Sequence, residues 1–151
     1  MQTLLKHLAT LGPIGYIPFA PGTFGSLAGL GCVWFFPLSL KMHFLFVIAG
    51  AIAGSYAATS AERQIRERDS KKIIIDEFIG FYMATFFVPH TKSLLISAFL
   101  IFRFFDIIKP LMISKVEKTL SNGTGIMADD ILAGIYTNIM LQGWLVIKNW
   151  A

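Results

Sequence analysis

The chain has 151 residues, of which 55% are hydrophobic, and a formal charge of +4. Its mean hydropathy of +0.65 lies beyond that of an ordinary soluble fold and predicts one membrane-embedded domain over residues 1–151. The basic residues lie in loops between apolar segments, which excludes a soluble nucleic-acid-binding face. The only cysteine, Cys32, excludes an internal disulfide.

The N-terminus carries Lys6 and His7 ahead of a short apolar run that Gly12 and Pro13 interrupt. Because it lacks a long apolar core and a cleavage site, we expect an interfacial segment rather than a removable signal peptide.

Apolar segments then follow one another along the chain. A bilayer core needs about 20 apolar residues per helix, so the shorter segments predict tilted helices or interfacial ends. We expect an all-α integral membrane bundle of four to five transmembrane or membrane-embedded helices. The segments are 26–40, 44–60, 78–89, 93–108 and 131–147.

The loops between these segments differ in positive charge. By the positive-inside rule, the side with more Lys and Arg is cytoplasmic. That side receives Lys6, Arg63, Arg66, Arg68, Lys71, Lys72, Lys109, Lys115 and Lys118, against Lys41, Lys92 and Lys148 on the other. The charged run 62–72 is typical of a solvated helix extension, with a secondary role in attracting anionic lipid headgroups.

Five of the nine acidic residues lie in or against apolar segments, where charge is costly. The same topology places all five at the cytoplasmic face. Their convergence predicts a Mg²⁺ site, because Mg²⁺ prefers carboxylate, water and phosphate oxygens. Neighbouring residues on a helix point about 100° apart, so each doublet should direct one acid inward. The predicted ligands are Asp76, Glu77, Asp106, Asp129 and Asp130, and the predicted catalytic residues are these acids without Glu77.

The alternative interpretation is that these acids have only a structural role. Asp and Glu stabilise helix N-termini, and the same carboxylates can pair with Arg103 or Lys109. That reading explains one cluster well and three clusters on one side less well.

Arg103, Asp106 and Lys109 recur every three residues and end at Pro110. Two cations beside an acid suit a phosphate next to a metal ion, although an intrahelical ion-pair ladder gives the same pattern.

Two glycine-bearing turns, 21–26 and 121–125, offer backbone N–H groups to a phosphate. Thr23 and Ser26 are candidate phosphate contacts in the first turn, and helix capping is the alternative role for both.

Four motifs occur in order: Pro-Gly-Thr-Phe-Gly-Ser at 21–26, Ile-Asp-Glu-Phe-Ile-Gly-Phe at 75–81, Phe-Arg-Phe-Phe-Asp-Ile-Ile-Lys-Pro at 102–110, and Gly-Thr-Gly-Ile-Met-Ala-Asp-Asp-Ile-Leu-Ala-Gly at 123–134. Together they resemble the phosphatidylglycerophosphatase A family. The resemblance implies a multi-pass phosphatase of the bacterial cytoplasmic membrane that depends on Mg²⁺. Its substrate would be phosphatidylglycerophosphate, and its product phosphatidylglycerol, in phospholipid biosynthesis. The residues with implied roles are Asp76, Glu77, Arg103, Asp106, Lys109, Asp129 and Asp130.

The mechanism expected on this basis uses Mg²⁺ to polarise the phosphate and activate water, with a carboxylate as general base. An aspartyl-phosphate intermediate is the alternative. Two other functional classes remain open from the sequence. An ion-coupled transporter or channel would use the acids as a cation site, and a structural subunit would use them only for caps and ion pairs.

Overall fold

The computed structural model describes residues 2–68, 70–110 and 123–150, and regular secondary structure within them is entirely helical. This confirms the all-α prediction. The elements are α1 (Gln2–Ala9), η1 (Ile14–Tyr16), α2 (Pro21–Phe35), α3 (Leu40–Ile65), α4 (Ile75–Ala84), α5 (Lys92–Ile108) and α7 (Gly123–Trp150).

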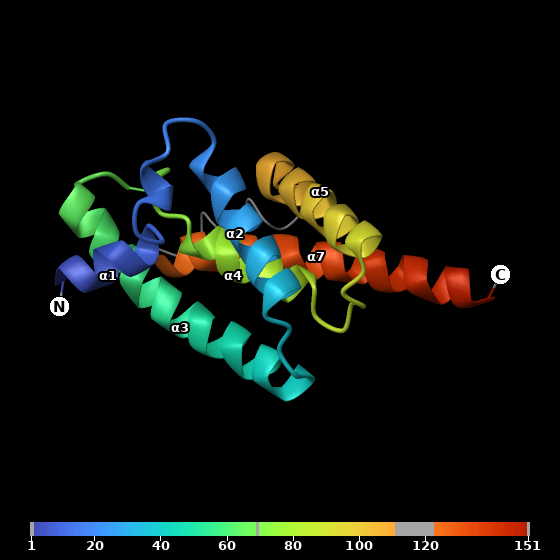
Figure 1. The fold of residues 1–151 in the computed structure, drawn as a ribbon. Coiled ribbons are helices and arrows are strands. Elements are labelled where there is room, and N and C mark those ends of the chain that lie inside the picture. Colours follow the sequence, from blue (N-terminus) through green and yellow to red (C-terminus); the bar gives the residue numbers. More distant parts are fainter. Residues whose placement is uncertain (1, 69, 111–122, 151) are drawn as a thin grey trace.

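The short helix α4 lies at the centre of the molecule, with α3 on one side and α5 on the other (Figure 1). It contacts α1, α2, α3, α5 and α7. Its sequence is apolar on all sides after the first turn, as is expected of a helix surrounded by others. The only charged residues of α4 are Asp76 and Glu77 in its first turn.

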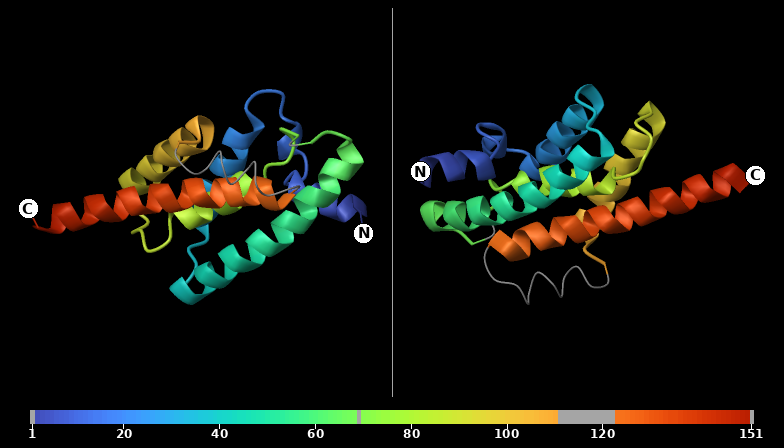
Figure 2. Two further views of the ribbon diagram at one scale, coloured as in Figure 1. Left: turned by 180° about the vertical axis from the view of Figure 1, so that it is seen from behind. Right: turned by 90° about the horizontal axis from the view of Figure 1, so that it is seen from below.

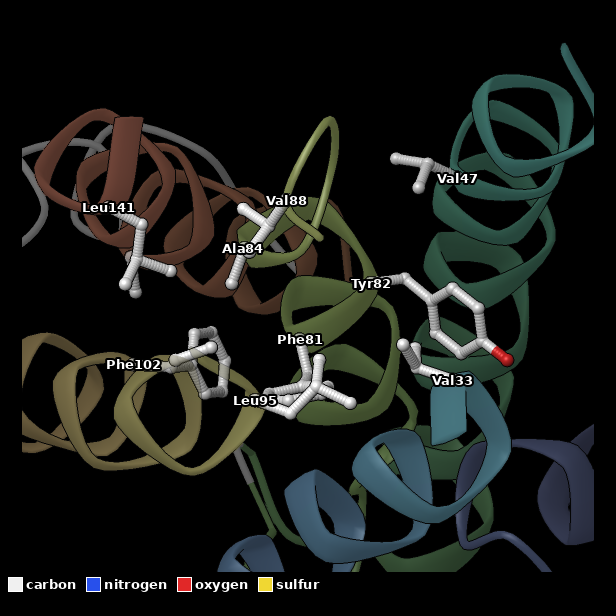
Figure 3. Close-up of a cluster of buried hydrophobic side chains, with 11 residues drawn as sticks. Val33, Val47, Phe81, Tyr82, Ala84, Val88, Leu95, Phe102 and Leu141 are labelled. Atoms are coloured by element: carbon white, nitrogen blue, oxygen red, sulfur yellow. The ribbon is translucent and has the colours of Figure 1, made fainter. Parts of the chain in front are cut away.

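Two apolar clusters hold α4 in place. In the first, Phe81 and Phe102 are fully buried, and their rings meet edge to face with centroids 6.1 Å apart (Figure 3). In the second, small residues of α3 let the helix approach closely. The second cluster includes Ala57, Ala58, Ala61, Ile75, Ile79 and Met127.

Helices α3 and α7 are the two described helices that are long and apolar enough to cross a membrane. They run in opposite directions along the molecule (Figure 2). Only 28% of each apolar window is buried inside the protein, so most of its surface faces outward. These two helices suggest a membrane protein.

The expectation of four to five membrane helices is not confirmed. Helix α2 has 15 residues, α4 has 10 and α5 has 17, which is less than the roughly 20 residues that a bilayer core requires. The predicted start of the last helix at residue 131 is wrong, because α7 already begins at Gly123. Helix α3 likewise runs beyond residue 60 to Ile65 and takes in the start of the charged run.

The N-terminal ends of α2, α4 and α7 meet the C-terminal end of α5. Gly80 is essential to this arrangement, because a Cβ atom there would lie 2.7 Å from the carbonyl oxygen of Asp130 and 2.9 Å from Cζ of Phe102. The missing side chain therefore lets α4 and α7 pack backbone to backbone. As a result, the acidic first turn of α4 lies beside the acidic pair of α7.

Candidate active site

A cavity of about 310 Å³ opens where these four helix ends meet. All five acidic residues singled out in the sequence line it, together with Arg103 and Lys109. Residues from three distant parts of the chain are thus brought to one place.

Three of the carboxylates form a compact cluster. One side-chain oxygen from each of Asp76, Glu77 and Asp130 lies within 4.8 Å of the others. Asp76 is 8% exposed and Asp130 is 3% exposed. Within the described residues, Oδ1 of Asp76, Oε2 of Glu77 and Oδ2 of Asp130 are buried and have no hydrogen-bond partner. Buried polar atoms are rarely left so, which indicates a ligand that these oxygens would bind.

The electrostatics of the cluster lead to the same conclusion. Burial raises the pKa of Asp76 well above its usual range, and the adjacent Glu77 carboxylate raises it further. Burial also raises the pKa of Glu77, to about 7. Negative charge is therefore unfavourable here without a cation. The donors are all carboxylate oxygens, so the site fits a hard divalent cation such as Mg²⁺.

The two acidic doublets behave differently. Both Asp76 and Glu77 belong to the cluster, which corrects the expectation that only one acid of each doublet points inward. In the other doublet Asp130 joins the cluster, while Asp129 forms an ion pair with Lys109. Because α7 begins at Gly123, neither Asp129 nor Asp130 lies in its first turn. N-terminal capping therefore does not explain this pair.

The cations flank the cluster through two ion pairs. Arg103 pairs with Asp106 on the same helix, while Nε of Arg103 is buried without a hydrogen-bond partner in the described part of the chain. Lys109 does not continue the helical stripe: it caps α5 with a φ of 49°, and its ammonium group pairs with Asp129 of α7. The predicted intrahelical ladder is thus limited to Arg103 and Asp106.

The first glycine-bearing turn contributes less than expected. Pro21 and Gly22 line the cavity at the start of α2, but Thr23 and Ser26 do not. Ser26 is fully buried, and its hydroxyl donates to the carbonyl oxygen of Gly22 at 3.0 Å. This geometry gives no support to phosphate contacts from Thr23 and Ser26, and neither residue is the N-cap, which is Ala20.

The structure describes the second glycine-bearing turn only in part, and it adds residues from the loop before α4 to the cavity. Residues 121 and 122 of the second turn lie outside the described residues. Sequence reasoning did not single out Ser70 and Lys71, which line the cavity from the loop before α4. The only feature of the sequence that could have pointed to them is their position in the charged run 62–72, shortly before Asp76.

A second and larger groove, of about 1020 Å³, lies between α1, α3 and α7. Among the described residues, Arg63 is its only charged lining residue, and no carboxylate lines it. Size alone would favour this groove, but only the smaller cavity combines convergent acids with cations, the arrangement expected of a catalytic site.

Comparison with known proteins decides the family. The family model described as phosphatidylglycerophosphatase A matches residues 7–145. The chain belongs to this family. The phosphatidylglycerophosphatase A of Haemophilus influenzae is 36% identical, over 94% of this chain and 96% of the relative. The Escherichia coli protein of the same name is 34% identical, over 85% of this chain and 77% of the relative.

A further relative carries a different name. A Bacteroides thetaiotaomicron protein called putative phosphatidylinositol-3-phosphatase is 35% identical, over 84% of both chains. No solved structure matches the chain significantly. All three relatives are named as phosphatases, so the phosphatidylglycerophosphatase A family is one of enzymes, and the transporter alternative is not supported.

The close approach of α4 and α7 gives a first prediction. Replacing Gly80 by Ala should push the backbone of Asp130 away from α4 and separate the carboxylates of Asp76 and Asp130. A misplacement of about 1 Å can lower turnover by about 100-fold, and we expect a loss of that order. The matched control is Gly143→Ala on α7, where a Cβ atom would meet nothing within 4 Å. Phosphate release by the two purified variants would test this, and equal activity would contradict it.

Proposed function

We propose that this protein hydrolyses the terminal phosphate monoester of phosphatidylglycerophosphate, giving phosphatidylglycerol and inorganic phosphate. The observation that carries the proposal is the cluster of Asp76, Glu77 and Asp130, whose buried oxygens lack partners in the described residues and lie in one cavity with Arg103 and Lys109. The names of the relatives supply the substrate, and the cavity supplies groups suited to a phosphate.

In this proposal Asp76, Glu77 and Asp130 hold Mg²⁺. The bound ion would supply positive charge against the phosphate oxygens and lower the pKa of water in the site. The buried Nε–H group of Arg103 would donate to a phosphate oxygen, while Lys109 would add a second positive charge at the cavity wall.

Asp106 and Asp129 act mainly as positioning residues in this scheme. Each forms an ion pair with one of the two cations, which fixes the direction in which the cation points. Hydrolysis requires attack of water on phosphorus, cleavage of the bond to the glycerol oxygen and transfer of a proton to that oxygen. A carboxylate of the cavity would accept the proton of the attacking water.

The location follows from the same residues. We propose that α3 and α7 cross the bacterial cytoplasmic membrane and that the cavity opens on its cytoplasmic side. The Lys and Arg residues of the loop after α3 favour that orientation. A lipid with its tails in the bilayer would then present its phosphate at the depth of the acidic cluster.

The direct test is phosphate release from phosphatidylglycerophosphate by the purified protein in detergent, with Mg²⁺ and after chelation. We expect release that stops on chelation and resumes when Mg²⁺ is restored. Phosphatidylinositol 3-phosphate serves as a second substrate, because one relative is named for it. If the folded protein released phosphate from neither lipid, the proposal would be contradicted. Release that continues after chelation would contradict the proposed requirement for Mg²⁺.

A further inference from the structure

The loop before α4 forms part of the cavity wall. Ser70 and Lys71 line the cavity, and backbone hydrogen bonds hold the loop at Ser70 and just after Lys71. The N–H group of Ile73 donates to the carbonyl oxygen of Ser70 at 2.8 Å, and that of Ile74 donates to Ala9 at 2.9 Å. The hydroxyl of Ser70 also donates to Oε2 of Glu67 at 2.7 Å. Hydrogen bonds at Ser70, Ile73 and Ile74 therefore hold the backbone around Lys71.

Lys71 and Lys72 have different surroundings although they are adjacent. The ammonium group of Lys72 lies 5.9 Å from the ring centroid of Tyr16, outside the cavity. Lys71 lines the cavity. A cation held over an aromatic ring has a favourable interaction of its own, whereas Lys71 has no ion pair with any residue in the described ranges.

The three basic residues that line the cavity within the described chain consequently differ in what they can bind. Arg103 and Lys109 each pair with a carboxylate of the cavity. Lys71 is exposed, and it comes from the loop that leads into α4 rather than from α5. It adds a positive charge to the cavity wall that no ion pair holds within the described residues.

We propose that Lys71 binds the diester phosphate of the lipid headgroup while the terminal monoester lies beside Arg103 and the cation that Asp76, Glu77 and Asp130 would hold. This rests on the proposed function. Phosphatidylglycerophosphate has two phosphates separated by a glycerol unit, and phosphatidylinositol 3-phosphate likewise has a diester and a monoester on one polyol. Phosphatidate has only a monoester. Lys71 thus selects lipids with two phosphates, because only these can engage Lys71 and the reacting site of the same cavity together.

The test compares Lys71→Gln with Lys72→Gln, two neutralisations at neighbouring positions. Calorimetry in Mg²⁺ would measure the binding of short-chain phosphatidylglycerol, which has only the diester phosphate, and of inorganic phosphate, which represents the terminal group. One charge-assisted hydrogen bond corresponds to about a 10- to 100-fold change in affinity. We expect Lys71→Gln to weaken phosphatidylglycerol binding by that factor and leave inorganic phosphate unchanged, while Lys72→Gln changes neither.

Turnover provides an independent measurement. Lys71→Gln should raise KM for phosphatidylglycerophosphate with little change in kcat, and Lys71→Arg should restore KM. Equal effects of the two Gln variants would overturn the proposal, because they would show that general surface charge attracts the lipid. Loss of inorganic phosphate binding in Lys71→Gln would also overturn it, because Lys71 would then bind the terminal phosphate. The binding measurement needs no turnover, so its failure is distinct from failure of the proposed function.

Discussion

Replacing Asp76 or Asp130 by Asn should nearly abolish phosphate release while the protein stays folded. Each substitution keeps the shape of the side chain and removes one charged oxygen from the cluster. Loss of a partner that merely supports a metal ligand costs about 10- to 100-fold in metal affinity or activity, so loss of a ligand should exceed about 100-fold. Phosphate release at saturating Mg²⁺ measures the effect.

Asp76→Asn should not destabilise the metal-free protein. Burial raises the pKa of Asp76, which means that the folded state disfavours its charged form. An uncharged Asn at that position removes this unfavourable term. We therefore expect Asp76→Asn to have a Tm without metal at least equal to that of the unsubstituted protein, and to lose the rise in Tm that Mg²⁺ causes by binding the folded state.

Glu62→Gln is the control, because it removes an acid of α3 that does not line the cavity. It should retain full activity and the response of Tm to Mg²⁺. Turnover that persists in both Asp76→Asn and Asp130→Asn would exclude the cluster as the metal site.

The gathering of the acids could be predicted because it depends on topology. The positive-inside rule used only Lys and Arg, yet it assigned Asp76, Asp106 and Asp129 to one face. The structure brings these residues to one cavity, whereas the five membrane helices used for the assignment are not confirmed. The exact start of each helix was harder to predict from the sequence. The sequence did not reveal that α7 begins at Gly123, and so it left N-terminal capping open for Asp130.

Loop residues were harder to predict than helix residues. Periodicity identifies a helix face, but it carries no information about how an irregular loop turns. Lys71 and Lys72 are equivalent in the sequence and differ only after the loop has been fixed by the hydrogen bonds of Ile73 and Ile74. In the same way, the turn chemistry of residues 21–26 suggested Thr23 and Ser26, whereas the cavity is lined by Pro21 and Gly22. The single domain and the Mg²⁺ requirement stay predictions.

Arg103→Gln should also cause a large loss of turnover. Two effects contribute, a loss of stability and a loss of phosphate binding, and they can be measured separately. Arg103 pairs with Asp106, and their side chains are 16% and 13% exposed. Removing one partner of a fully buried pair typically destabilises a protein by about 3–5 kcal/mol, because the other charge is left without compensation. The Arg103–Asp106 pair is only partly buried, so we expect a smaller loss of stability. Loss of a hydrogen-bond donor to a developing negative charge lowers turnover by about 10²- to 10³-fold. The single variant should show both effects.

The double variant Arg103→Gln with Asp106→Asn separates them. It removes both charges and retains side chains that can hydrogen-bond to each other, so Tm should recover most of what the single variant loses. Turnover should stay low, since Nε–H of Arg103, which has no partner within the described chain, is still missing. Recovery of turnover together with Tm would reduce Arg103 to a partner for Asp106. Lys109 would then be the cation that binds the reacting phosphate, and its pairing with Asp129 across α5 and α7 would become the contact that positions it.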